Sequence, residues 1–174
     1  STATVTVRSS IPIASGLGSG AAVSTALVRA LGTFMGRTLP PAEVSQLVFE
    51  VEKIHHGTPS GIDNTVIAYE RPVYYVRGAA TEAEGISVGT PFTLLVVDTG
   101  LPSPTKPLVS RVREAWQQDR RRYESLFEAI GDIAEEARDR IEAGDVRSLG
   151  PLMDENHALL AQLRAAGVPV EEQV

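Results

Sequence analysis

The chain has 174 residues, of which 43% are hydrophobic and 22% are charged, a composition typical of a globular domain with a real core. Its net charge of −6 argues against a general nucleic-acid binder, and it has no apolar run of membrane-spanning length, so neither partner is expected. The absence of cysteine excludes disulfides and thiolate metal sites and suits a cytoplasmic protein.

The first predicted element is a half-buried strand over residues 3–9, where apolar and polar residues alternate. A glycine-rich loop follows and opens a helix over residues 21–35, with Gly36 placed to end it. Glycines at alternate positions let a ligand reach the backbone amides, and the free N–H groups of the helix start favour an anion such as phosphate. The loop consists of Gly16, Leu17, Gly18, Ser19, Gly20 and Ala21.

Other interpretations of this loop are open. The structural alternative is a flexible connection that starts a helix. A P-loop of the form G-x-x-x-x-G-K-[ST] is excluded, because no lysine follows the last glycine. The dinucleotide pattern G-x-G-x-x-[GA] is satisfied, but the second strand that it requires is missing, since residues 39–43 start another helix. A dehydrogenase is therefore a minor alternative.

A second helix is predicted from residues 40–41 to about residue 55, where glycine and proline break the pattern. Glu52 borders its apolar face and leans toward the interior. The structural alternative for Glu52 is a half-exposed residue paired with an arginine. His55 and His56 are adjacent and diverge on a helix, so we expect structural hydrogen bonding from them rather than a zinc site.

The next stretch, HGTPSGIDN, is too rich in glycine, proline and small polar residues for a strand, and it is interpreted as an ordered loop that enters a short helix. Ser60 can cap this helix, with Asp63 in its first turn, a spacing similar to a capping box. That capping role is the structural alternative for Asp63.

Strands are predicted over residues 73–76 and 92–97, the second apolar enough to lie centrally in a sheet, with a polar loop over 78–85. Thr105 can cap a following helix. Helical periodicity covers residues 108–122, 123–143 and 146–166.

The glycine loop, the HGTPSGIDN run and the Thr105-Lys106 turn resemble the small-molecule kinase superfamily of galactokinase, homoserine kinase, mevalonate kinase and phosphomevalonate kinase, and within it they match the mevalonate kinase family. The most specific part is H-G-x-P-S-G-[IV]-D-N with a helical glutamate eleven residues before the aspartate. The resemblance implies an α+β, two-domain kinase fold with the active site between the domains, only partly covered by this chain. Residues 1–90 would be part of an N-terminal kinase domain, and residues 91–174 part of a mainly helical C-terminal domain.

The resemblance also implies roles for residues. The loop from Gly16 to Ala21 would bind the phosphates of ATP, and Asp63 would face the hydroxyl that is phosphorylated. Glu52 and Ser19 would hold Mg²⁺. The implied reaction is ATP-dependent phosphorylation of the primary hydroxyl of mevalonate, and a homodimer is left open. Substrate-binding positions would be His56, Ser60, Gly61 and Thr105.

Two departures from the family pattern matter. Family members usually carry Ser-Ser where this chain has Ser19-Gly20, so Ser19 or a water would replace the second serine at Mg²⁺. The family's upstream Pro-Gly-Lys motif and its later glycine-rich motif are absent, so we interpret residues 1–174 as an interior piece of a longer kinase and expect them to be inactive alone. Another kinase of the superfamily, acting on phosphomevalonate, homoserine or a sugar, and a non-catalytic nucleotide-binding fragment are the alternatives.

Overall fold

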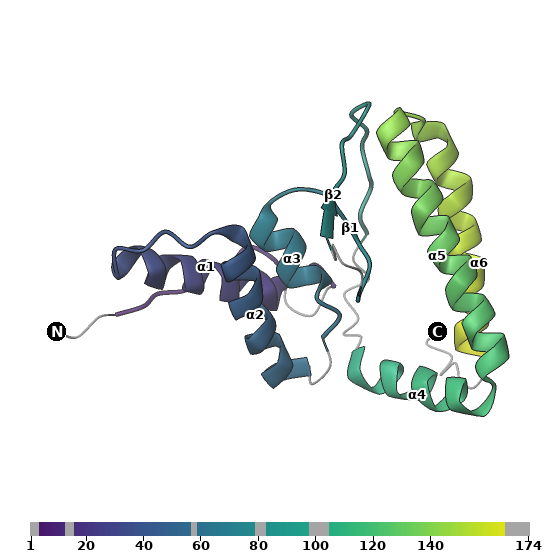
Figure 1. Ribbon diagram of the computed structural model, residues 1–174, viewed down its shortest axis with the longest axis horizontal. Helices are drawn as coiled ribbons and strands as arrows, with labels where there is room; N and C mark the ends of the chain where they lie inside the picture. Colours follow the sequence, from purple (N-terminus) through teal and green to yellow (C-terminus); the bar gives the residue numbers. More distant parts are fainter. Residues whose placement is uncertain (1–3, 13–15, 57–58, 79–82, 98–104, 166–174) are drawn as a thin grey trace. The chain divides into compact units, whose positions relative to one another are not determined.

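The fold is helix-rich with one small sheet, which confirms the predicted α+β class (Figure 1). Among the described residues, no helix is both long and apolar enough to cross a membrane. The side chains of residues 55–56, 105–108 and 164–165 are not described. The computed structural model describes residues 4–12, 16–56, 59–78, 83–97 and 105–165.

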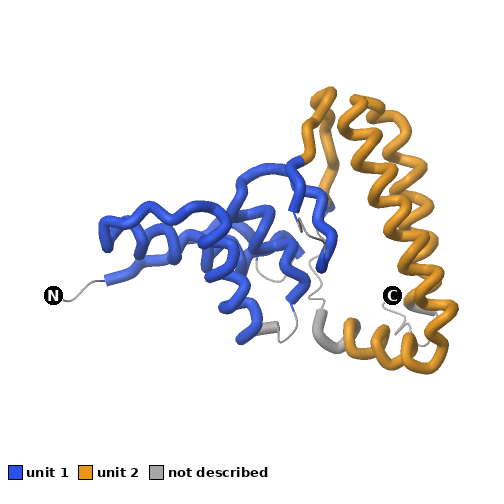
Figure 2. The backbone as a smooth tube through the Cα atoms, viewed as in Figure 1, with its two compact units in different colours: residues 1–85, 97–103 blue, residues 86–96, 104–174 orange. Residues whose placement is uncertain are grey.

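The chain divides into two compact units (Figure 2). The first consists of residues 1–85 and 97–103, and the second of residues 86–96 and 104–174. Each unit has its own buried cluster of apolar side chains, so each is described by itself.

The first unit is built on three helices, α1 (Ser19–Phe34), α2 (Pro41–His56) and α3 (Ile62–Tyr69), which all contact one another. Val44 and Val48 lie one turn apart on α2 and are fully buried in the cluster between the helices. This confirms the predicted apolar face of the second helix. The other buried members are Ala21 and Ala68, whose small side chains let the helix backbones approach closely.

The sheet of the first unit pairs β1 (Val73–Tyr75) with the antiparallel strand β2 (Ala83–Gly85). β1 confirms one predicted strand. β2 lies where a polar loop was predicted, and that prediction was wrong. The sequence of β2 has no apolar alternation that could have predicted it. The strand forms through backbone pairing to β1, in which Tyr74 lies opposite Glu84.

Two predicted strands do not form. Residues 4–9 and 92–97 have no regular secondary structure, and residue 3 lies outside the described part. Leu95 in the second stretch is 89% exposed, where a central strand would be buried. A strand needs a neighbour for its backbone hydrogen bonds, and no described segment pairs with either stretch.

The second unit is mainly helical (Figure 1). Its elements are α4 (Thr105–Gln118), α5 (Arg120–Ala143), a 3₁₀ turn η1 (Val146–Ser148) and α6 (Leu149–Ala165). Its core joins α4, α5 and α6, with Tyr123 almost fully buried beside Ala115, Leu126 and Leu163.

The break between α4 and α5 falls at Asp119 rather than after residue 122 as predicted. The Asp119 carboxylate accepts the N–H of Arg122 and so caps α5. The three arginines at residues 120–122 follow this cap directly and made the helix boundary hard to recognise in the sequence. The predicted end of α5 is confirmed, since Gly144 has a φ of 76°. After it, the Ser148 hydroxyl donates to the Asp145 carboxylate at 2.6 Å and lowers the pKa of that carboxyl.

Gly32 and Gly131 test the packing of the helices, because both lie inside a helix but only Gly32 is crowded. A Cβ atom at Gly32 would lie 3.1 Å from the carbonyl oxygen of Arg37 and 3.2 Å from Cγ of Leu39. At Gly131 no atom in the described part of the chain lies within 4 Å of such a Cβ atom. We expect Gly131→Ala to raise the free energy of unfolding by about 0.5–1 kcal/mol, because alanine favours a helix.

Gly32→Ala should instead lower the free energy of unfolding by about 1 kcal/mol or more, since a backbone carbonyl cannot move aside as a side chain can. Denaturant titration of the full-length protein, followed by circular dichroism, measures both values. An equal gain from the two variants would contradict the close contact at Gly32.

Candidate functional site

The glycine-rich loop ends in the N-terminus of α1. Gly16 and Gly18 have φ values of 75° and 67°, in the left-handed region that favours glycine. The helix begins at Ser19, two residues earlier than predicted, and its first internal hydrogen bond runs from the Ala22 N–H to the Gly18 carbonyl. The N–H groups of residues 19–21 therefore have no acceptor inside the helix. Together with the positive end of the helix dipole, they can hold an anion.

Asp63, in the first turn of α3, lies against this loop. A Cβ atom on Gly18 would be 3.8 Å from Cγ of Asp63 and 3.1 Å from Cδ1 of Ile67. Asp63 is exposed, so a dissolved molecule can reach its carboxylate. The predicted phosphate loop and the predicted catalytic aspartate are thus brought together.

Glu52 approaches the same loop from α2. A Cβ atom on Gly20 would lie 3.5 Å from Oε1 of Glu52. Glu52 is only 6% exposed and lies one turn after Val48 on the buried face, which confirms that it leans toward the interior. The loop therefore has two carboxylates beside it. Glu52 lies beside Gly20, and Asp63 lies beside Gly18.

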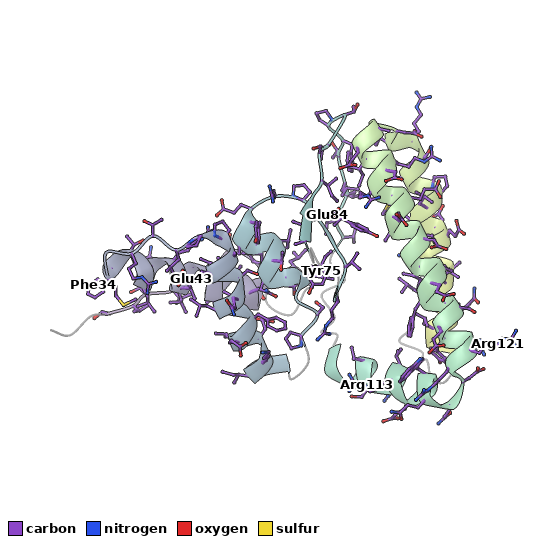
Figure 3. All side chains as sticks on the ribbon, in the orientation of Figure 1. Phe34, Glu43, Tyr75, Glu84, Arg113 and Arg121 are labelled. Atoms are coloured by element: carbon purple, nitrogen blue, oxygen red, sulfur yellow. The ribbon has the colours of Figure 1, made fainter. Side chains whose placement is uncertain are left out.

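At the start of α3 the backbone of Gly61 lies close to the side chain of Tyr75. The N-cap of α3 is Gly61, with a φ of 94°, and not Ser60 as predicted. Ser60 lies one position before this N-cap, and its hydroxyl accepts the N–H of Ile62 at 3.3 Å. A Cβ atom on Gly61 would overlap the hydroxyl of Tyr75, a residue of β1 that is labelled in Figure 3. This position therefore requires glycine for both its φ and its space.

Several predicted site positions are described only in part. His56 ends α2 and Thr105 begins α4, but their side chains lie outside the described part of the structure. Thr105 was predicted to cap its helix from the position before it, but it is the first residue of α4, and it belongs to the second unit. Residues 13–15 and 57–58 also lie outside the description.

Sequence reasoning missed a set of buried polar side chains between α2 and α3: Ser45, Asn64 and Thr65. A signal was present in the spacing, because Ser45 precedes Glu52 by seven residues and so shares its side of α2. Asn64 and Thr65 directly follow Asp63. The sequence interpretation of this stretch gave a role to the aspartate and none to these two neighbours.

Several known proteins are similar to this chain in sequence. Residues 1–71 match the model of the GHMP kinase N-terminal domain. The chain is 34% identical over 165 residues to a mevalonate kinase of Thermococcus sibiricus, a match that covers 92% of the chain and 48% of the relative. It is 32% identical over 188 residues to a mevalonate kinase of Arabidopsis thaliana, covering 97% and 49%. The chain spans about half the length of the curated relatives it matches.

A solved structure is similar as well. The crystal structure of L. major mevalonate kinase in complex with R-mevalonate superposes with a TM-score of 0.71 at 32% identity. The superposition covers 84% of this chain and 45% of that one. The likeness therefore extends beyond the glycine loop to most of the fold.

The approach of Gly18 to α3 can be tested against Gly16 in the same loop. Alanine at either position costs about 1–2 kcal/mol for the left-handed backbone. Only the alanine at Gly18 also meets Ile67, since no atom of the described residues lies within 4 Å of a Cβ atom at Gly16. We expect Gly18→Ala to lower the free energy of unfolding by about 1 kcal/mol more than Gly16→Ala does.

Ile67→Val removes the Cδ1 atom that an alanine at Gly18 would press on. In that background the two glycine variants should cost the same within error, as measured by denaturant titration of the full-length protein. A difference that persists with Val at position 67 would show that the loop does not pack on α3 through this contact.

Proposed function

We propose that the full-length protein is a mevalonate kinase of the GHMP kinase family, whose N-terminal domain model matches residues 1–71. The proposed reaction transfers the γ-phosphoryl group of ATP to the primary hydroxyl of mevalonate and gives 5-phosphomevalonate. The observation that carries the proposal is the convergence of Glu52 and Asp63 on neighbouring glycines of one anion-binding loop. The names of the relatives support mevalonate as the substrate.

The chemistry of phosphoryl transfer suits these groups. Its transition state is loose, so it needs positioning and charge neutralisation more than a strong base. The N–H groups of residues 19–21 would cradle phosphate oxygens of ATP, and glycines at 16 and 18 leave the backbone uncovered for that approach. These local N–H groups would bind the phosphates of ATP although the net charge of the chain is −6.

Glu52 and Ser19 are suitable ligands for Mg²⁺. Glu52 brings a carboxylate to the glycine loop, and Ser19 brings a hydroxyl in the first turn of α1. Within the described residues, no group of three His, Asp or Glu side chains could hold a metal by itself. That agrees with Mg²⁺, which is commonly held by one or two carboxylates together with the phosphates of the substrate. The ion would neutralise phosphate charge.

Asp63 would orient the acceptor alcohol. A carboxylate is a weak base for an alcohol, so it would accept the proton late in the transfer. Its exposure leaves room for the substrate. Asp63 therefore acts in this proposal mainly by holding the hydroxyl in line with the phosphoryl group.

The motif match extends the proposal to further positions. His56, Ser60, Gly61 and Thr105 would contact mevalonate. Residues 1–90 would be part of the N-terminal kinase domain, and residues 91–174 part of a mainly helical C-terminal domain. The protein would act in the cytoplasm.

Substrate choice is tested by ADP release from the full-length protein with ATP and Mg²⁺. Mevalonate, phosphomevalonate, homoserine and galactose are supplied in turn. We expect turnover with mevalonate alone. Turnover with another of the four would assign the protein to a different kinase of the superfamily, and nucleotide binding without turnover on any of them would support a non-catalytic role.

Asp63→Asn keeps the shape of the side chain and removes its charge. We expect kcat and kcat/KM for mevalonate to fall together by about 10²–10³-fold, because the carboxylate acts mainly in the transition state. The dissociation constant of ATP, measured by calorimetry, should stay within a few-fold of wild type. Wild-type kcat in this variant would show that Asp63 does not act in the transfer.

Glu52→Gln should raise the Mg²⁺ concentration that gives half-maximal rate, since it weakens a proposed ligand. Gly20→Ser should lower that concentration, because its Cβ atom fits at 3.5 Å from Glu52 and its hydroxyl adds an oxygen there. Glu50→Gln is the control, since Glu50 is on the same helix but pairs with Lys53 on the exposed side. Initial rates across a Mg²⁺ titration measure all three. Equal half-maximal concentrations for wild type and Glu52→Gln would make Glu52 an ordinary helix residue.

A further inference from the structure

Three polar side chains are buried where α2 meets α3. Ser45 on α2 is 9% exposed, and Asn64 and Thr65 on α3 are 4% and 6% exposed. Elsewhere this contact is apolar, with Val44 and Val48 of α2 in the buried cluster. Buried polar groups are costly unless they are hydrogen-bonded, so their arrangement at this contact is informative.

The three side chains form one connected chain of hydrogen bonds. The Asn64 amide donates to the Ser45 carbonyl at 3.1 Å and to the Ser45 hydroxyl at 2.9 Å. The Ser45 and Thr65 hydroxyl oxygens are 3.4 Å apart. The Thr65 hydroxyl donates to the Gly61 carbonyl at 2.6 Å.

The direction of this chain is determined. Thr65 has a single hydroxyl hydrogen, and the bond to the Gly61 carbonyl uses it. Ser45 must therefore donate to Thr65, while it accepts from Asn64. Donation thus runs one way, from the Asn64 amide through Ser45 and Thr65 to the N-cap residue of α3. Such a network accepts one relative placement of the two helices, because any slip leaves a buried donor or acceptor unpaired.

The network joins the two helices that carry the site carboxylates. Ser45 lies two turns before Glu52 on α2, and Asn64 and Thr65 directly follow Asp63 on α3. We propose that Ser45, Asn64 and Thr65 are positioning residues that set the Asp63 carboxylate relative to Glu52 and the glycine loop. This inference rests on the proposed kinase function and adds a role for residues that touch neither ATP nor the acceptor alcohol.

Thr65→Val tests the proposal, because valine has the shape of threonine without the hydroxyl. Thr33→Val is the matched control. The Thr33 hydroxyl also donates to the carbonyl four residues earlier, that of Arg29 at 3.0 Å, but it does so on an exposed face of α1. We expect Thr65→Val in the full-length kinase to lower kcat roughly 10-fold, because small displacements of reacting groups are costly in rate. The dissociation constant of ATP should change less than two-fold, and Thr33→Val should retain the wild-type kcat.

A second background separates positioning from loss of structure. If Thr65 acts through Asp63, Thr65→Val should lower the residual rate of the Asp63→Asn variant less than two-fold, because the group that it positions is already gone. A merely structural effect would lower the rate about 10-fold in both backgrounds. Circular dichroism and melting temperature establish that each variant is folded at the assay temperature. If Thr65→Val does not fold, Ser45→Ala is used in its place.

The outcomes distinguish this inference from the proposed function. Wild-type turnover in Asp63→Asn would overturn the kinase role of Asp63, and the positioning role with it. A severe loss in Asp63→Asn together with wild-type kcat in folded Thr65→Val would overturn the positioning role alone. Equal losses from Thr65→Val in both backgrounds would also overturn it.

Discussion

The site depends on how closely a backbone loop can approach two helices. At Gly18 and Gly20 the loop has no side chain, and the atoms nearest to an added Cβ include those of Ile67, Asp63 and Glu52. A larger residue at Gly18 would press on Ile67, and the left-handed backbone there excludes most residues in any case. In the proposed kinase site the glycines would serve two purposes, because they would uncover the helix N-terminus for an anion and admit the carboxylates to its side.

The rest of the first unit supports that approach. Val44 and Val48 anchor α2 in the core, and Glu52 continues the same buried face to the loop. On α3 the hydrogen-bonded chain that ends at Gly61 fixes the helix start that carries Asp63. Apolar packing thus brings the helices together, whereas the buried polar bonds select one register between them. Rapid phosphoryl transfer requires such fixed geometry, because positioning supplies much of its catalysis.

The sequence predicted the helices of the first unit well, because each has an apolar stripe and a glycine or proline boundary. It also predicted that Glu52 leans inward, from periodicity alone. It failed where order depends on a partner segment: β2 forms without an apolar pattern, and residues 92–97 have the pattern without pairing to any described strand. The approach of Gly18 to Asp63 and the hydrogen bond of Ser45 with Asn64 join residues far apart in sequence, so a local pattern could indicate which side chains are buried but not which of them meet.

The most direct test is a crystal structure of the full-length protein with mevalonate, Mg²⁺ and a non-hydrolysable ATP analogue. The account predicts phosphate oxygens of the analogue on the N–H groups of residues 19–21, the metal at the Glu52 carboxylate, and the primary hydroxyl of mevalonate within hydrogen-bond reach of Asp63. Phosphates bound away from the glycine loop, or a mevalonate hydroxyl that is out of reach of Asp63, would contradict it.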